Sequence, residues 1–284
     1  MRDADVDTSE FKERERNTWA RVAPGWRKHD EFLVRATAPV TERMLDLLRL
    51  SPGQHVLDIA SGTGEPAIPM GERVGPSGYV IGTDFVWEML AFAREKAAAR
   101  NLRHVEFRCL DGERLEFPQD VFDAASIRWG LMFMPDPIGC LRQAHGALKE
   151  TGRIAVACWA QPEQNPWASL PMAIIRRHLN APPPPPETPG IFAFADMGRL
   201  RGALEQAGFR DVSVEAVDVT MADFDTGRMF FTFMSDLAGP ITALFKQLPA
   251  EKQSHVIDEI SRQAAGPDGR VVLKGVTWVA AAAK

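Results

Sequence analysis

Cysteine, tyrosine, positive charge and long apolar runs are all scarce in this sequence, and each scarcity argues against a class of protein. Three cysteines, an odd number without metal-ligand spacing, favour reduced thiols in the core. A net charge of −5 gives no basic patch for nucleic acid. No apolar run approaches the roughly 18 residues that span a bilayer, and the acidic residues 1–7 are unlike a signal peptide. We therefore expect a cytoplasmic protein with no membrane span, no bound metal and no nucleic-acid partner.

Apolar residues are abundant, and tryptophan and phenylalanine are prominent among them. With 284 residues, 45% of them hydrophobic, the chain is expected to form one domain with an elaboration. Seven tryptophans and sixteen phenylalanines stand against a single tyrosine. Because tyrosine is the aromatic side chain with a hydroxyl, this ratio predicts a ligand pocket that is apolar rather than hydrogen-bonding.

The most informative segment is Val56–Gly64 (VLDIASGTG), an apolar run that leads into two glycines. The run fits a central parallel strand that is buried on both faces. Gly62 and Gly64 let the backbone turn sharply and let a ligand approach without a Cβ in the way. Pro66 and Pro69 follow, at positions that the first turn of a helix tolerates. Open α/β sheets bind ligands where a strand's carboxyl end leads into a helix, so this segment predicts a nucleotide-type cofactor site.

Two cofactors fit this loop, and Asp58 distinguishes between them. The segment 62–67, followed by Asp84 at about the expected 20 residues, also satisfies the loose dinucleotide fingerprint. However, a carboxylate at position 58 is costly to bury unless a cation or several donors meet it. S-adenosyl-L-methionine (SAM) offers an ammonium and a sulfonium, whereas a dinucleotide offers a pyrophosphate, which Glu65 would repel. The sequence therefore favours SAM.

Further acids lie at the ends of later predicted strands. Residues 80–84 form an apolar run ending in Asp84, which can accept hydrogen bonds from both ribose hydroxyls; the alternative is a cap for the following helix. Residues 104–112 alternate in polarity and lead to Asp111, which can accept a hydrogen bond from the adenine amino group, with Gly112 at the ring edge. The alternative for Asp111 is an ordinary turn acid. Residues 122–129, 152–159, 212–217 and 269–279 are also predicted strands.

Taken in order, Asp58-x-x-x-Gly62-x-Gly64, Asp84, Asp111-Gly112 and Phe122-Asp123 resemble the motifs of the class I SAM-dependent methyltransferases. Within that class the sequence is most similar to the ubiquinone/menaquinone-biosynthesis type. Residues 19–26 resemble the N-terminal segment of that type. The resemblance covers residues 15–160 well and continues through residues 199–209. It implies an α/β fold with a seven-stranded, mostly parallel Rossmann-like sheet, helices on both faces and an antiparallel last strand.

An insertion separates the last two predicted strands, which normally form a near-hairpin in this fold. About 50 residues intervene here, and residues 229–234 and 249–265 within them are predicted helices. Such an insert would lie at the carboxyl end of the sheet, over the methyl donor, as a helical substrate lid. The expected organisation is an N-terminal helical segment covering the site (1–50), a SAM-binding core (51–160), an insert with a late helix and the sixth strand (161–221), the helical lid (222–268) and the seventh strand (269–284).

Several cofactor candidates have a plain structural alternative. Asp58 lies near the SAM amino group or merely orders the loop, and Phe85 packs on the adenine face or in the core. Arg128 offers its backbone carbonyl to the SAM ammonium, or its side chain forms a salt bridge at the surface. With the loop residues, the predicted cofactor-binding set is Asp58, Ala60, Ser61, Gly62, Gly64, Asp84, Phe85, Asp111, Gly112 and Arg128.

The acceptor side of the site is predicted from aromatic residues and one histidine. His29 lies three residues after Trp26 on a predicted helix, hence on the same face, and could deprotonate an acceptor hydroxyl. The alternative is a solvated histidine without a catalytic role. Methyl transfer does not require a base, because alignment of donor and acceptor supplies much of the rate. Tryptophan and phenylalanine are usually core residues, but those near the sheet's carboxyl end are substrate candidates: Trp26, Trp129, Phe133, Trp167, Phe192 and Phe230.

These observations predict a SAM-dependent methyltransferase that acts on O or C of an apolar small molecule and releases S-adenosyl-L-homocysteine. A homodimer is a further expectation. One alternative is a SAM-fold cyclase or a SAM-binding protein without methyl transfer. An NAD-dependent oxidoreductase is less favoured, because of Asp58 and because no second catalytic domain is evident.

Overall fold

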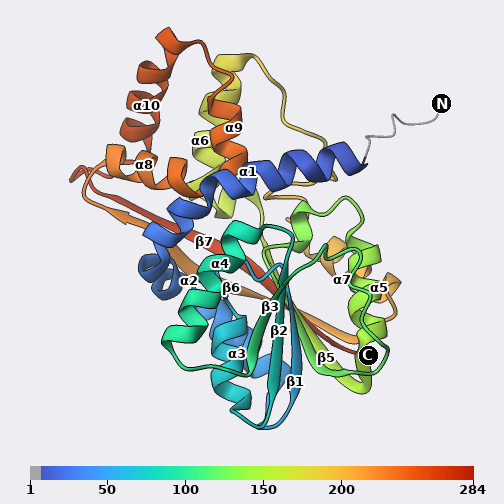
Figure 1. Ribbon diagram of the computed structural model, residues 1–284. Coiled ribbons are helices and arrows are strands. Elements are labelled where there is room, and N and C mark those ends of the chain that lie inside the picture. The colour runs from blue at the N-terminus through green and yellow to red at the C-terminus, as the bar shows by residue number, and fades with distance from the viewer. Residues whose placement is uncertain (1–7) are drawn as a thin grey trace, which may run out of the picture.

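Seven strands form one twisted sheet in residues 8–284, which are the residues that the computed structural model describes (Figure 1). The strands are β1 (His55–Ile59), β2 (Tyr79–Asp84), β3 (Val105–Cys109), β4 (Phe122–Arg128), β5 (Leu148–Trp159), β6 (Arg210–Phe224) and β7 (Val271–Ala283). Their order across the sheet is β3-β2-β1-β4-β5-β7-β6. The first five strands pair in parallel, whereas β7 runs antiparallel to both β5 and β6. The predicted fold class is therefore confirmed.

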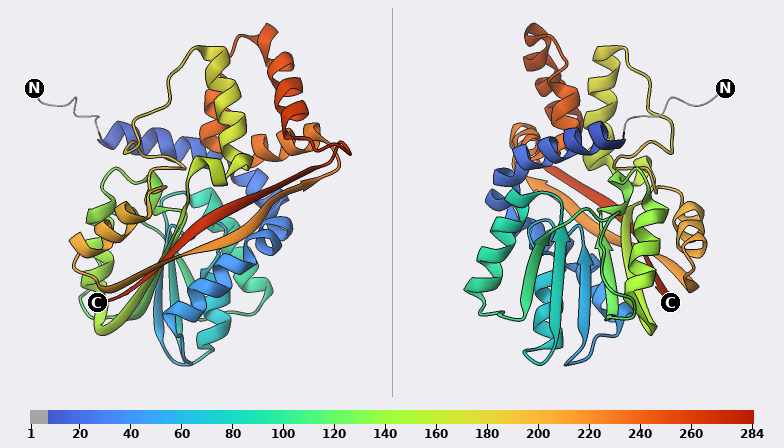
Figure 2. Two further views of the ribbon diagram at one scale, coloured as in Figure 1. Left: turned by 180° about the vertical axis from the view of Figure 1, so that it is seen from behind. Right: turned by 45° about the vertical axis from the view of Figure 1, so that its right-hand side comes forward.

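Helices cover both faces of this sheet and its carboxyl edge (Figures 1 and 2). The helices are α1 (Thr8–Lys28), α2 (Asp30–Leu48), α3 (Ala67–Val74), α4 (Trp87–Ala99), α5 (Pro137–Ala147), α6 (Pro166–Leu179), α7 (Met197–Gln206), α8 (Gly227–Leu237), α9 (Gly239–Phe245) and α10 (Ala250–Ala264), with short 3-10 turns at Leu131–Phe133 and Pro162–Gln164. Among the described helices, none is long and apolar enough to cross a membrane.

Local sequence explains where these elements begin and why they are buried. All residues of β1 after His55 are buried, as expected for a central parallel strand, and Asp58 is the charged residue among them. Helix α5 begins where the Asp136 carboxylate accepts a hydrogen bond from the Gly139 N–H (2.8 Å) and Pro137 occupies the first turn. Two of the cysteines, Cys140 and Cys158, are buried free thiols, while Cys109 is exposed.

Strands β6 and β7 are longer than the sequence suggested, and their far ends leave the sheet. Strand β5 pairs with β7 only over residues 277–283, whereas β6 pairs with β7 as far as Phe224 and Val271. The remaining length is a two-stranded ribbon, which Figure 2 shows running out towards the C-terminal helices. Strand β6 thus continues to Phe224, beyond the predicted strand at 212–217 and beyond position 221, where the segment that contains it was expected to end.

Helices α8, α9 and α10, here called the helical insert, connect the two strands of this ribbon. Helices α8 and α10 lie where helices were predicted; Ala238 separates α8 from α9, which begins with Gly239. The insert packs with α6 and α1 above the carboxyl edge of the sheet (Figure 1). Helix α1 approaches α8 very closely, because a Cβ on Gly25 would lie 2.0 Å from the Asp236 carbonyl oxygen. The Trp26 indole also donates a hydrogen bond to the Leu237 carbonyl (3.1 Å).

Candidate active site

The loop after β1 is held in a shape that glycine makes accessible. Gly62 and Gly64 have φ values of +52° and +97°, and Ala60 also has a positive φ, of +58°. A Cβ on Gly64 would lie 2.8 Å from the Ile68 side chain, so position 64 is restricted by space as well as by conformation. The turn therefore presents backbone, rather than side chains, at the carboxyl end of the central strand.

Asp84, at the end of β2, ties this loop to the next one. One carboxylate oxygen accepts a hydrogen bond from the Gly62 N–H (2.9 Å), and the other accepts one from the Val86 N–H (2.9 Å). Burial raises the pKa of Asp84 to about 6, although these backbone donors oppose that effect. The carboxylate is thus positioned by the main chain, and each oxygen keeps a second lone pair for a ligand.

Asp58 lies deeper, and its contacts are with the neighbouring strand. The Ser126 hydroxyl on β4 donates a hydrogen bond to one of its oxygens (2.6 Å), and the other oxygen has no partner among the described residues. Burial raises the pKa of Asp58 to about 6, with Ser126 opposing the shift. This supports the loop-ordering alternative, because Asp58 does not line the cavity described next.

A cavity of about 150 Å³, here called the cofactor cavity, opens where these loops meet. Of the ten predicted cofactor residues, Asp58 and Gly64 do not line it. Eight do: Ala60, Ser61, Gly62, Asp84, Phe85, Asp111, Gly112 and Arg128. The lining also includes α1 residues that sequence reasoning missed: Phe11, Lys12, Glu15 and Trp19. Phe11, Glu15 and Trp19 are four positions apart and mark one helical face, but nothing in the sequence indicates what that face covers.

Lys12 of α1 reaches the acid predicted for the adenine amino group. Its ammonium lies 2.6 Å from Asp111 and also contacts Glu113. Burial works to lower the pKa of Lys12, but the hydrogen bonds to these two carboxylates outweigh it and raise the pKa. Asp111 also accepts a hydrogen bond from the Glu113 N–H (3.0 Å), which orders the turn. Helix α1 is therefore fastened across one end of the cofactor cavity.

Arg128, at the end of β4, turns its side chain inward rather than toward a surface salt bridge. Its guanidinium donates hydrogen bonds to the hydroxyls of Thr37 (2.8 Å) and Thr41 (3.2 Å) on α2, and lies 4.7 Å from the Trp129 ring centroid. Its buried Nε has no partner among the described residues. Burial lowers the pKa of Arg128, and the charges of Glu65 and Asp58 counteract this effect.

A second cavity, of about 100 Å³ and here called the acceptor cavity, adjoins the first. Arg128 is the only charged side chain among the described residues that line it. The two cavities share Trp19, Trp26, Arg128, Trp129 and Phe133. The rest of the lining comes from distant segments: Leu33, Thr37, Met132, Trp159, Trp167, Ile191, Met221, Phe233, Met234, Leu237, Ala238 and Pro240.

Three tryptophans pack one against the next along a wall of the acceptor cavity, and the first two are stacked. The ring centroids of Trp129 and Trp159 lie 4.5 Å apart with the planes at 6°, and Trp159 and Trp167 lie 4.8 Å apart. The Trp129 indole donates to the Thr277 hydroxyl of β7 (3.3 Å). Trp129 also has a φ of +57°, a conformation of the kind that costs about 1–3 kcal/mol for a non-glycine residue and that clusters at functional sites.

Three of the predicted acceptor-side residues line neither cavity. Phe230 is 0% exposed and packs in the core, with its ring centroid 6.4 Å from that of Phe224 on the ribbon. It is Phe233, one turn further along α8, that faces the cavity, a difference that sequence spacing could not decide. Phe192 packs half-buried against the core. The His29 imidazole lies 2.8 Å from Asp236, so it ties the end of α1 to α8.

The sheet order, the loop after the first strand and the acid that ends the second strand define the class I SAM-dependent methyltransferase fold. Residues 40–172 match the ubiE/COQ5 methyltransferase family. The chain is also a distant relative of the demethylmenaquinone methyltransferases.

The individual relatives cover a similar share of the chain. Demethylmenaquinone methyltransferase from Listeria monocytogenes is 36% identical over 132 residues, which are 46% of this chain and 56% of the relative. Aklanonic acid methyltransferase DauC from Streptomyces sp. (strain C5) is 34% identical over 127 residues, 45% of this chain and 58% of that protein. The chain thus spans little more than half the length of these curated relatives.

A solved structure extends the likeness in fold further along the chain. The crystal structure of a SAM-dependent methyltransferase from Aquifex aeolicus is 23% identical, with a TM-score of 0.50, and the likeness covers 66% of this chain and 87% of that one.

Proposed function

We propose that this protein transfers the methyl group of SAM to an oxygen or carbon atom of an apolar small molecule. The observation that supports it most is the pair of adjoining cavities, one bordered by acidic side chains and backbone loops and one apolar, with shared walls. A methyl group moving from sulfonium to acceptor has to cross such a junction, and alignment of the two reactants supplies much of the rate.

In the cofactor cavity the proposal assigns one part of SAM to each loop. Asp84 accepts hydrogen bonds from the ribose hydroxyls while the Gly62 and Val86 N–H groups hold its carboxylate. Phe85 packs on the adenine, and Asp111 accepts a hydrogen bond from the adenine amino group. The methionine part then lies along Ala60, Ser61 and the end of β4, near the Arg128 backbone, with the sulfonium methyl directed toward the acceptor cavity.

In the acceptor cavity the walls are aromatic and the one charge is cationic. Trp26, Trp129, Phe133 and Trp167 provide apolar surface for the acceptor. Arg128 lies on the border, and its unpartnered Nε is available to an oxygen atom of the acceptor. We place His29, Phe192 and Phe230 outside the acceptor contacts. The helical insert acts as a lid over the acceptor cavity.

This arrangement favours acceptors that ionise readily by themselves. No imidazole or carboxylate occurs among the described residues lining the acceptor cavity. A hydroxyl or carbon acid with a low pKa would present an anion to Arg128 without needing a protein base, and the sulfonium is a strong electrophile. Demethylmenaquinone and aklanonic acid, the compounds in the relatives' names, are therefore the first acceptors to test, in the reduced form for the quinone.

The test is turnover with SAM and a panel of ring compounds that carry acidic hydroxyl or carboxyl groups. We expect S-adenosylhomocysteine and a product heavier by one CH2 in equal amounts, measured by mass spectrometry. Conversion of an acceptor without S-adenosylhomocysteine would instead identify a cyclase. Binding of NAD but not SAM in calorimetry would contradict the proposal altogether. Cytoplasmic location and a homodimer remain predictions, to be checked by cell fractionation and light scattering.

A further inference from the structure

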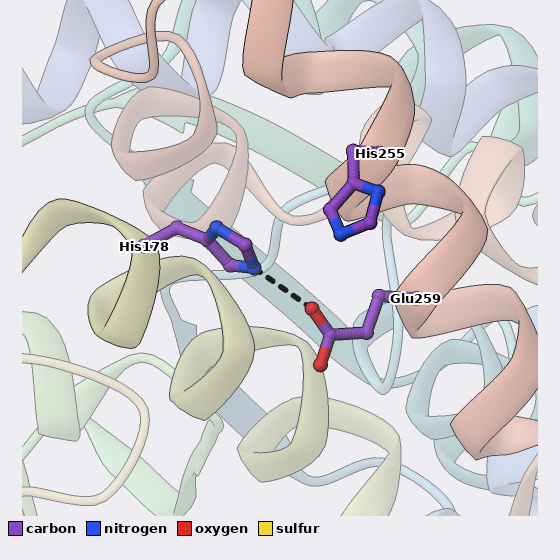
Figure 3. Close-up of side chains that lie close together, drawn as sticks. All are labelled: His178, His255 and Glu259. Carbon is purple, nitrogen blue, oxygen red and sulfur yellow. Dashed lines mark hydrogen bonds and ion pairs between the residues drawn. The ribbon is translucent and has the colours of Figure 1, made fainter.

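Three side chains of metal-ligating type meet in the helical part above the sheet, away from the two cavities (Figure 3). His178 lies near the end of α6, while His255 and Glu259 lie on α10. The latter two are four residues apart, so they share one face of that helix. The ligand atoms of all three residues lie within 4.8 Å of one another. This juxtaposition does not follow from any local spacing, because 77 positions separate His178 from His255.

The distances between these atoms are close to those of a metal site. Zinc bonds of about 2.0–2.2 Å at a tetrahedral angle separate the ligand atoms by about 3.3–3.6 Å. His178 Nε2 and Glu259 Oε2 are 2.7 Å apart and would move apart slightly. The His255 side chain is exposed and can rotate to shorten the longer separations. Two imidazoles and one carboxylate form a ligand set that zinc sites use, with a water molecule in the fourth position.

The surroundings of Glu259 orient its carboxylate for this role. Gln263 donates a hydrogen bond to Oε1 (2.9 Å), and Arg177 contacts the same oxygen, so Oε2 is the atom that faces the histidines. Such contacts to the second oxygen hold a metal-binding carboxylate in place. The Arg177 side chain is 60% exposed, so solvent screens its charge.

We propose that His178, His255 and Glu259 bind one divalent transition-metal ion of the zinc class. The ion would join α6 to α10. Because α6 also carries Trp167, which lines the acceptor cavity, the ion would steady one wall of that cavity from outside. This differs from the expectation of no metal, which rested on the spacing of cysteines. The proposal does not depend on the methyltransferase activity.

The experiment uses full-length protein without an affinity tag, dialysed against a chelator, and the metal alone as probe. Calorimetric titration with ZnCl2 should show one ion per chain, and Co2+ should give the visible absorption of a tetrahedral site. His255→Ala and Glu259→Gln should each weaken zinc binding by at least about tenfold, since even loss of a supporting residue costs roughly 10–100-fold. The control is His55→Ala, an exposed histidine at the start of β1, which should bind zinc like the parent protein.

Thermal unfolding provides a second readout. Zinc should raise the Tm of the parent protein by a few degrees and leave the Tm of His255→Ala unchanged, because a ligand stabilises only the folded state that binds it. The proposal is overturned if the parent protein binds no zinc at millimolar concentration. It is equally overturned if the two site variants bind zinc as tightly as the parent, because the ion would then lie elsewhere.

Discussion

The cofactor cavity and the acceptor cavity are neighbours with shared walls, yet they are built in opposite ways. The first is formed mainly by short turns at the ends of four consecutive strands, β1 to β4, where backbone N–H groups fix acidic side chains. The second is formed mainly by apolar side chains that are far apart in the sequence, from α1, α2, α6, β6, α8 and α9 as well as from the segment after β4 and the end of β5. Most of the first lies within the family match at residues 40–172, and most of the second lies outside it.

This difference shows what each ligand requires of the chain. A cofactor with fixed polar groups needs a few oriented backbone and carboxylate groups, which local sequence can specify. An apolar acceptor needs a shaped surface, and such a surface results from long-range packing that can change without disturbing the sheet. The following experiments test how independent the two cavities are.

The largest effect should come from removing the helical insert. Replacing residues 225–270 with Asn-Gly would join Phe224 to Val271 by a two-residue turn that suits a hairpin. The deletion removes Phe233, Leu237 and their neighbours from the acceptor cavity but no residue from the cofactor cavity. Turnover should be abolished, while the SAM Kd from calorimetry changes by less than about tenfold. A folded deletion protein that loses SAM binding as well would show that the cavities are not independent.

Trp129→Ala should have the next largest effect. Removing a buried aromatic contact costs about 2–3 kcal/mol, equivalent to a loss of roughly 30- to 150-fold in kcat/KM. Because Trp129 stacks on Trp159 in the acceptor wall, the SAM Kd should change much less than kcat/KM. Trp87→Ala, at a tryptophan that is 57% exposed, is the control and should leave the kinetics unchanged. Equal losses in both quantities would assign Trp129 to the cofactor side.

Asp84→Ala should act on the other cavity, weakening SAM binding by at least about tenfold. Two hydrogen bonds to a charged acceptor contribute roughly 1.5–3 kcal/mol each, and the substitution also releases the Gly62 N–H. Glu88→Ala, an exposed acid in the first turn of α4, is the matched control. Unchanged SAM affinity in a folded Asp84→Ala protein would disprove the ribose assignment.

The raised pKa of Asp84 gives a pH dependence with opposite signs for ligand binding and for stability. Its carboxyl becomes protonated below about pH 6, so SAM affinity should fall by up to about tenfold per pH unit between pH 6 and 5. In the unliganded protein, the contribution of this group to the free energy of unfolding should decrease as pH rises from about 4 through 6, because the folded state binds the proton more tightly. Asp84→Asn should remove the pH dependence of the SAM Kd in titrations and reduce the pH dependence of stability in denaturant melts, to which Asp58, with a similarly raised pKa, still contributes. A constant SAM Kd in the parent protein from pH 7 to 5 would contradict this assignment.

Lys12→Ala should have the smallest effect. The Lys12 contacts with Asp111 and Glu113 are partly exposed, and such pairs contribute about 0.2–1 kcal/mol. The dissociation rate of SAM, measured by stopped flow, should therefore rise by no more than about fivefold. Lys252→Ala on the exposed face of α10 is the control. A slower dissociation rate would mean that α1 hinders SAM binding rather than retaining the cofactor.

The sequence was sufficient for the sheet and for most of the cofactor cavity because both follow from local patterns. The apolar run around Asp58, the apolar run that ends in Asp84 and the alternating segment before Asp111 identify strands and their carboxyl ends, and the paired glycines identify the turn. Gly64 and Asp58 do not line the cavity, and only the register of β1 on β4 shows that Asp58 contacts Ser126.

The acceptor cavity and the role of α1 could not be predicted in the same way. Four aromatic residues were predicted because they lie near the carboxyl edge of the sheet, and they do line the acceptor cavity: Trp26, Trp129, Phe133 and Trp167. Phe230 met the same criterion but faces the ribbon, because the choice between it and Phe233 depends on how α8 rotates against β6. Lys12 was missed because its partners are about one hundred positions away.

Helix α1 borders both cavities, through Trp19 and Trp26, and is fastened to Asp111 by Lys12. If donor, acceptor and products all pass this helix, its opening would set the pace of the catalytic cycle, as opening steps do in many enzymes. Rapid mixing of excess substrates with enzyme should then give a burst of methylated product equal to the enzyme concentration, followed by a slower steady rate set by release.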